Sequence, residues 1–111
     1  MRPGQRPKPS PHGAAALAAL TAFDLARTAR VPLETAERWL AGTTSAAGTE
    51  AERLYELADV IALLHAAGLR EPAVQGEWLR NPHPAFGRQA PLDVIAIGEH
   101  HRVVEYVETQ S

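Results

Sequence analysis

Residues 77–104 decide the fold, and they read EWLRNPHPAFGRQAPLDVIAIGEHHRVV. Two prolines follow Arg80 closely, and because proline cannot continue a helix, the tryptophan-bearing segment should end there. Pro91 suits the first turn of a new helix, and Gly98 is typical of the position just past a helix end. The stretch therefore predicts three short helices, over about 72–80, 91–98 and 99–109. The first of them carries three apolar residues, Val74, Trp78 and Leu79.

Helical signals also occupy the first half of the chain. We expect an alanine-rich helix over 14–19 and a second helix that is capped by Thr21 and runs to Arg30. Pro32 can begin a third helix, which stops at Gly42. Its apolar residues recur at helical spacing and are expected to anchor it to the core. They are Leu33, Ala36, Trp39 and Leu40.

The longest predicted helix follows a loop of small residues. Thr49 and Glu52 have the spacing of a capping box, and Gly68 marks the other end. The residues expected on its apolar face are Leu54, Leu57, Ala58, Ile61, Leu64 and His65, with Glu52, Glu56 and Asp59 on the opposite face. No segment alternates apolar and polar residues as a strand would. The predicted fold is all-α.

Composition indicates a small domain with a thin core. The chain has 111 residues, of which 45% are hydrophobic but only 5% are aromatic. Alanine, leucine and valine supply most of the apolar mass, which favours packed helices. A core of this size is marginal by itself, so burial against a partner or a second copy is expected.

Charge is distributed unevenly along the chain. The net charge is −2, which does not favour a strongly basic nucleic-acid binder. Residues 1–30 carry five basic side chains against one acidic, whereas residues 31–111 carry six against twelve. We therefore divide the chain into three regions. They are a disordered basic, proline-rich tail over 1–12, a helix-turn-helix region over 13–48, and a long helix with a C-terminal module over 49–111.

Several functional classes lack support in the sequence. The chain has no cysteine, which excludes disulfides, zinc fingers and thiol catalysis. It has no signal-peptide pattern and no apolar stretch long enough to span a bilayer, so a cytoplasmic protein without membrane contact is expected. Phosphate-binding loops and nucleophile elbows are missing, so we expect no enzyme and no cofactor. The neighbours His100 and His101 diverge around a helix, so no metal site is expected.

The segment over 23–42 is typical of a helix-turn-helix. Its second helix would present Glu34, Thr35, Glu37 and Arg38 to the major groove. The spacing resembles the Xre-type, phage-repressor-like motif, with two departures. Arg30 stands at the turn position that is usually glycine, and Pro32 replaces the usual capping serine. The two glutamates would repel phosphate, so a helical hairpin that serves only as scaffold remains an alternative.

The combined order of Trp78-Leu79, Asn81-Pro82, Phe86-Gly87, Pro91-Leu92-Asp93, Gly98 and Val103 resembles the toxin-binding domain of the Xre/MbcA/ParS antitoxins. With the helix-turn-helix, the resemblance covers residues 23–111. It implies an Xre-like helix-turn-helix, then a long amphipathic helix and a small helical toxin-binding module. It also implies a partner, a RES-domain toxin that destroys NAD and whose NAD pocket the antitoxin obstructs.

Carried onto this chain, the resemblance places the toxin contact on the last helix. The candidate residues are Glu99, His100, Arg102, Val103, Tyr106 and Val107. Tyr106 joins an apolar body to a polar tip, which suits an interface. The valines fit equally well a helix that packs on its own core. A contact role for Val103 predicts that Val103→Asp abolishes neutralisation while the protein stays folded.

The function expected from the sequence is therefore the antitoxin of a type II toxin–antitoxin pair, which occludes its toxin and can also repress its own operon. We expect a homodimer or a hetero-oligomer with the toxin. The alternatives are a stand-alone helix-turn-helix regulator that binds operator DNA and a purely structural dimerisation module.

Overall fold

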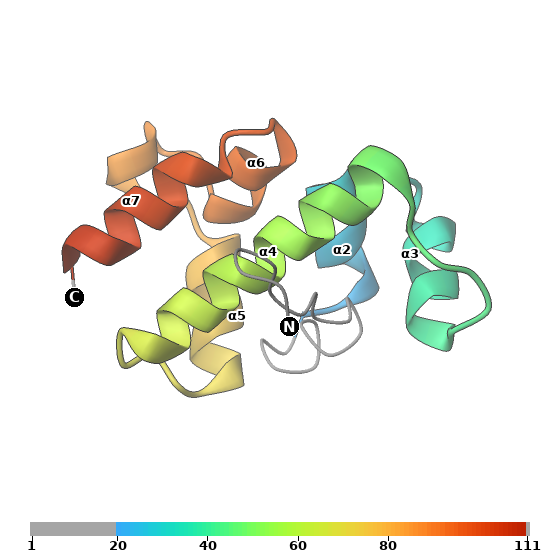
Figure 1. Cartoon of the computed structure of the whole chain (residues 1–111), viewed down its shortest axis with the longest axis horizontal. Coiled ribbons are helices and arrows are strands. Elements are labelled where there is room, and N and C mark those ends of the chain that lie inside the picture. The colour runs from blue at the N-terminus through green and yellow to red at the C-terminus, as the bar shows by residue number, and fades with distance from the viewer. Residues whose placement is uncertain (1–19, 111) are drawn as a thin grey trace, which may run out of the picture.

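The structure, a computed structural model, describes residues 20–110, and every regular segment in that range is helical (Figure 1). The elements, in chain order, are α2 (Ala22–Ala29), α3 (Leu33–Ala41), α4 (Gly48–Ala66), α5 (Pro72–Arg80), the 3₁₀ helix η1 (Pro84–Phe86), α6 (Pro91–Ala96) and α7 (His100–Gln110). The all-α prediction is confirmed for the described range. The tail predicted over 1–12 and the helix predicted over 14–19 lie outside it.

Local signals fix the bounds of α2 as the sequence predicts. The hydroxyl of Thr21 accepts a hydrogen bond from the backbone N–H of Asp24, and the Asp24 carboxylate accepts one in return from the Thr21 N–H at 2.8 Å. This reciprocal capping box satisfies N–H groups that the first turn leaves unpaired. At the other end Arg30 adopts a left-handed conformation, with φ at 58°. Its N–H donates to the carbonyl of Ala26 and closes the helix.

The start of α4 differs from the prediction. The helix begins at Gly48, its N-cap is Ala47, and no side chain caps it. Thr49 therefore lies inside the first turn, so the capping box expected between Thr49 and Glu52 is wrong. A Thr-x-x-Glu pattern fits both a cap and an ordinary first turn, and the extended backbone at Ala47 decides between them.

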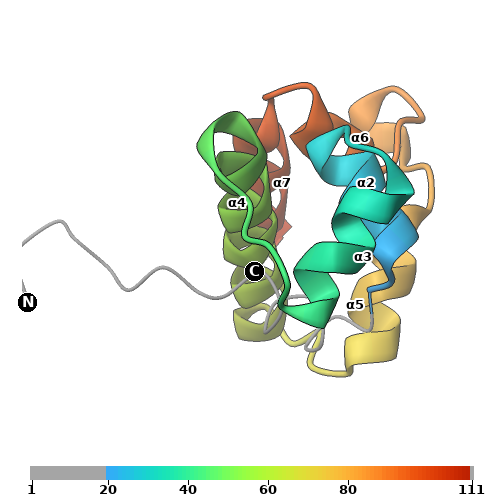
Figure 2. The ribbon, with the colours of Figure 1, turned by 90° about the vertical axis from the view of Figure 1, so that its right-hand side faces the viewer.

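The core forms around α4, the longest helix, which packs on α2, α5, α6 and α7 (Figures 1 and 2). Its buried face carries the predicted leucines, with Val60 in addition. In contrast, α3 packs chiefly on α2 and lies at the rim of the molecule. None of the helices in residues 20–110 is both long and apolar enough to span a lipid bilayer. The largest of the fully buried apolar side chains are Phe86, Leu25, Leu54, Leu57, Leu79, Leu92 and Ile95.

Two residues expected on packed faces, Leu40 and His65, are exposed instead, and so is Val74 of α5. Leu40 is 38% exposed, because α3 is covered mainly on the side that carries Ala36 and Trp39. Val74 is 43% exposed, because α5 buries a different stripe, made of Gln75, Gly76 and Leu79. His65 lies exposed near the end of α4. Helical spacing identifies a face only to within about one residue, so neighbours in space decide which side is covered.

Two ion pairs tie α2 to the C-terminal helices. The guanidinium of Arg80 on α5 donates through Nε to the buried carboxylate of Asp24, at 3.0 and 3.1 Å. Arg27 binds both carboxylate oxygens of Asp93 on α6, at 2.6 and 2.7 Å. This hydrogen-bonded pairing with Asp93 raises the pKa of the Arg27 side chain above its ordinary value. The first helix of the helix-turn-helix is thus attached directly to the C-terminal module.

Candidate functional site

Four aromatic side chains gather where α5, η1 and α7 meet. They are Trp78, His83, Phe86 and Tyr106, called here the aromatic cluster. Every ring contacts the other three, with centroids 4.8 to 6.4 Å apart. Phe86 is buried at 2% exposure, whereas the other three rings are half-buried. Three of the chain's six Phe, Trp and Tyr side chains therefore gather at the boundary of core and solvent, where they can serve both packing and recognition.

A closed loop over 83–89 positions two of these rings. The His83 ring accepts a hydrogen bond through Nδ1 from the backbone N–H of Ala85, at 3.1 Å. The His83 N–H donates to the carbonyl of Gln89, and the Arg88 N–H donates back to the carbonyl of His83, both at 3.1 Å. Two successive residues, Gly87 and Arg88, adopt left-handed conformations that allow this reversal. The loop is therefore held in one shape by its own backbone.

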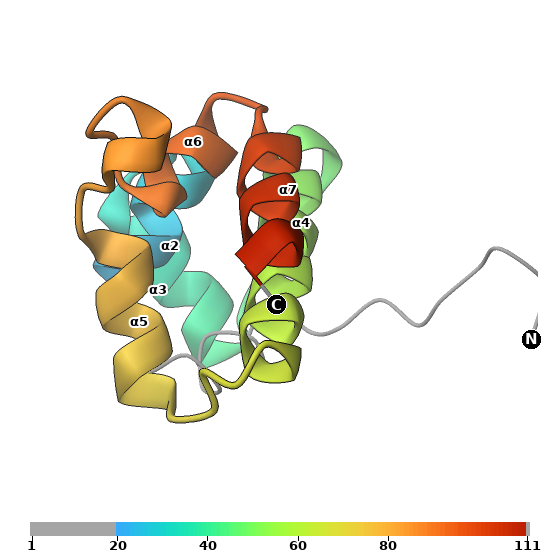
Figure 3. The same cartoon turned by 90° about the vertical axis from the view of Figure 1, so that its left-hand side faces the viewer.

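Two depressions flank the aromatic cluster, one bordered by η1 and α7 and the other by α5. Figure 3 shows the side of the molecule on which α5 and α7 lie. The first measures about 350 Å³. It is lined by Ala85, Phe86, Arg102, Glu105, Tyr106 and Thr109. The second, about 400 Å³, lies along α5. It is lined by Leu69, Val74, Glu77, Trp78, Asn81, Pro82 and His83. Phe86 and Tyr106 thus line the first depression, and Trp78 and His83 line the second.

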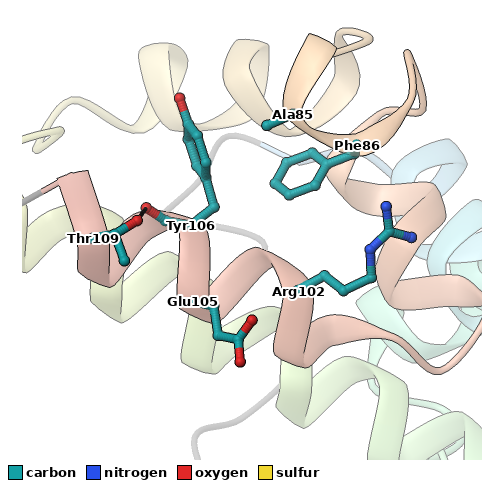
Figure 4. A pocket seen from close by; sticks show the side chains of 6 residues that line it. All are labelled: Ala85, Phe86, Arg102, Glu105, Tyr106 and Thr109. Carbon is teal, nitrogen blue, oxygen red and sulfur yellow. Dashed lines mark hydrogen bonds between the residues drawn. The ribbon is translucent and has the colours of Figure 1, made fainter.

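Figure 4 shows how the first depression is built. The Phe86 ring points into it from η1, and the Arg102 guanidinium lies at its end, beside that ring. The Tyr106 ring rises from α7 with its hydroxyl directed outward, while Glu105 points away from Phe86. Arg102 is also bonded to Glu99, at 2.7 Å. The arrangement offers an apolar wall with a polar rim, which is the composition of a protein–protein contact.

The residues predicted to contact a toxin fall into two groups. Arg102 and Tyr106 are partly exposed and line the first depression, and Glu99 supports Arg102. Val103 and Val107 face inward, at 0% and 5% exposure, and belong to the core. Their assignment to a contact surface is wrong, because α7 turns its valine stripe toward α4 and α6.

His100, the remaining candidate, faces α4. Its Nδ1 atom lies 3.2 Å from a carboxylate oxygen of Glu56, which also binds Arg53. Glu56 was expected on the solvent face of its helix, and that expectation is wrong as well, since its side chain is only 14% exposed. Residues 20–110 contain no group of three His, Cys, Asp or Glu side chains placed to hold a metal ion.

The residues predicted to read DNA lie on α3. Glu34 and Arg38 are exposed, Thr35 is half-buried, and a three-residue turn separates α2 from α3 as the helix-turn-helix interpretation requires. Arg38 donates to Glu34 one turn earlier on the same helix. This ion pair reduces the positive charge that α3 presents to phosphate.

The sequence interpretation missed His83 and Phe86 as site residues and treated Trp78 as a core anchor. The signal available in the sequence was an aromatic pair placed between prolines, at His83-Pro84-Ala85-Phe86-Gly87. Local pattern could indicate a turn there, but not which rings of α5 and α7 the turn would meet.

Comparisons with known proteins point to the same part of the chain. Residues 57–110 match the family model described as the antitoxin Xre/MbcA/ParS C-terminal toxin-binding domain. The fold is similar to that of a chain in the crystal structure of the MbcT–MbcA toxin–antitoxin complex of M. tuberculosis, with 23% sequence identity and a TM-score of 0.76. The similarity covers 91% of this chain and 89% of that one. The search of curated proteins returned no match.

Proposed function

We propose that the protein is the antitoxin of a type II toxin–antitoxin pair, because residues 57–110 match the model of the Xre/MbcA/ParS antitoxin C-terminal toxin-binding domain. The matched range contains all four rings of the aromatic cluster and every residue that lines the two flanking depressions. That coincidence is the observation that carries the proposal.

The partner that we propose is a RES-domain toxin that consumes NAD. Neutralisation would be steric, with this chain covering the entrance to the toxin's NAD pocket. The C-terminal module supports this mode of action because it is a rigid helical platform with a partly exposed aromatic face. Such a platform binds without a large ordering cost, since its side chains are already fixed by mutual contact.

The contact face that we propose is centred on the aromatic cluster and includes Arg102. Tyrosine, tryptophan and arginine are the side chains that most often dominate the free energy of protein–protein binding. Trp78, Tyr106 and Arg102 meet on one face here and are each partly exposed. The buried valines of α7 support this face from beneath rather than contacting the toxin.

Co-expression with the protein encoded by the adjacent gene tests the proposal. We expect a complex that survives size-exclusion chromatography, and we expect the toxin's NAD consumption to stop within it. Light scattering on the same sample gives the stoichiometry. Separate elution of the two proteins, or an adjacent protein without toxicity, would contradict the antitoxin function.

Tyr106→Ala is expected to weaken toxin binding by about 2–3 kcal/mol, or roughly 30- to 150-fold, as for a central interface tyrosine. Isothermal titration calorimetry measures the change, and circular dichroism confirms that the variant is folded. Tyr106→Phe retains the ring contacts and should lose much less. His101→Ala is the matched control, because His101 is exposed on the same helix outside both depressions. Equal losses for Tyr106→Ala and His101→Ala would argue against this contact face.

We further propose that the α2–α3 corner gives the antitoxin weak affinity for its own operator. The observation that favours it is the helix–turn–helix arrangement, with Thr35 and Arg38 on the outer helix. The alternative, a stand-alone regulator, would bind DNA with no toxin partner. The two functions separate cleanly, because only the antitoxin forms a complex with the adjacent protein.

Glu34 and Arg38 provide opposite tests of DNA binding. Arg38→Ala should weaken operator binding. The slope of log affinity against log salt concentration should fall by about one, as expected for the loss of one phosphate contact. Glu34→Ala should strengthen binding, because it removes a negative charge and frees Arg38 from its ion pair. Gel shifts at several salt concentrations measure both effects. Absence of any shift at low salt would contradict the DNA-binding role.

A further inference from the structure

Arg88 occupies a backbone conformation that does not favour arginine. Its φ is 69°, in the left-handed region where a Cβ atom crowds the backbone and glycine is the usual residue. Gly87 precedes it with a φ of 62°, so the loop places two left-handed residues in succession. The first is glycine, as the geometry favours, but the second carries a long charged side chain.

Nothing within residues 20–110 pairs with that side chain. Arg88 is exposed, and its guanidinium makes neither an ion pair nor a hydrogen bond in the described part of the chain. The two arginines of the neighbouring helices differ in this respect. Arg80 is bonded to Asp24, and Arg102 is bonded to Glu99. The Arg88 side chain therefore contributes no visible contact that would offset its backbone conformation.

The backbone around Arg88 is nevertheless firmly held. Its own N–H donates to His83, and the Gln89 N–H donates to Phe86, so the loop is bonded to two members of the aromatic cluster. Both of those rings pack on Trp78 and Tyr106. The Arg88 side chain thus starts from a fixed backbone, in the loop that carries His83 and Phe86 of the proposed contact face. Unfavourable backbone conformations that the surroundings hold in place occur most often at functional sites.

We propose that Arg88 binds a carboxylate of the toxin and acts as a fixed polar anchor beside the aromatic cluster. This inference rests on the proposed antitoxin function and adds the chemistry of one contact to it. A guanidinium matches a carboxylate with two parallel hydrogen bonds, which supplies both binding and orientation. A base that is already ordered reduces the conformational freedom that the contact has to remove. The partner should therefore present an aspartate or glutamate next to its apolar contact.

Arg88→Gly separates the role of the side chain from that of the backbone. Glycine accepts the left-handed conformation, so the thermal midpoint of the free protein should stay the same or rise. Affinity for the protein encoded by the adjacent gene should fall at least tenfold. Arg88→Lys keeps the charge and should recover part of that loss.

Arg30 supplies the matched control. It is also an exposed arginine in a left-handed conformation, with φ at 58°, but it lies at the turn between α2 and α3. Arg30→Gly should leave toxin affinity unchanged. Calorimetry with the purified adjacent protein measures binding, and gel shifts on operator DNA are run with the same variants.

The possible outcomes decide between the explanations. Wild-type affinity in Arg88→Gly, equal losses in Arg30→Gly and Arg88→Gly, or a lower thermal midpoint in Arg88→Gly would each overturn the inference. A loss of DNA binding in Arg88→Gly with toxin binding intact would also overturn it, because that result would mean that Arg88 binds DNA phosphate. If the wild-type chain does not bind the adjacent protein at all, the proposed function itself fails, and this inference fails with it.

Discussion

Val103→Asp is expected to unfold the protein rather than to disable a contact. Val103 is fully buried between helices, within the main hydrophobic core. The substitution removes a buried apolar side chain and places a carboxyl group where no partner for it exists in the native packing. A loss of about 4 kcal/mol or more is expected, which is a large part of the stability of a small domain.

Circular dichroism and urea unfolding measure this effect directly. His101→Asp serves as the control, because it introduces the same side chain two residues earlier, on the exposed side of α7. It should change stability by no more than about 0.5 kcal/mol. If Val103→Asp keeps a wild-type unfolding midpoint but loses toxin binding, α7 does not pack as described and the original contact hypothesis is restored.

Asp24→Ala is expected to have the second-largest effect on the free energy of unfolding, a loss of about 2–3 kcal/mol. The Asp24 carboxylate is buried and accepts hydrogen bonds from the Thr21 backbone, the Thr21 hydroxyl and Arg80. Loss of a helix cap costs about 0.5–2 kcal/mol, and loss of a carboxylate from a partly buried arginine adds to it. Chemical denaturation measures the difference.

Asp93→Ala provides the comparison for Asp24→Ala. Its ion pair with Arg27 is shorter, at 2.6 Å, but the two side chains are 38% and 40% exposed. Water competes for exposed charges, so this variant should lose no more than about 1 kcal/mol. Similar losses for the two variants would mean that the α2 cap and the burial of Asp24 add little, contrary to the contacts described here.

The ion pair between Asp24 and Arg80 also connects the helix-turn-helix region to the C-terminal module. Asp24 receives Arg80, which lies two residues after Trp78 of the aromatic cluster. A toxin bound to that cluster would contact the helix that stabilises the start of α2. The helix-turn-helix and the proposed toxin-contact face therefore share structural support, although they are separated by roughly half the chain.

The sequence by itself determined where most of the helices begin and end, the start of α4 excepted. Thr21 and Pro91 begin helices, Gly42 and Gly98 follow helix ends, and the structure places all four at those positions. These signals act through hydrogen bonds and backbone geometry within one helical turn, so a local pattern contains most of what is needed. The order of the elements also sufficed to predict the resemblance to the antitoxin toxin-binding domain whose model residues 57–110 match.

Only the tertiary structure decided which faces those helices bury. Val103 and Leu40 both fit apolar stripes, yet one is fully buried and the other is 38% exposed. Asp24 and Arg80 are 56 residues apart, and no local pattern pairs them. The aromatic cluster likewise joins α5, η1 and α7 across the turn at Gly98. Burial depends on neighbours that the chain brings together from a distance, and this is why the toxin contact that we propose lies on the aromatic cluster rather than on the valines of α7.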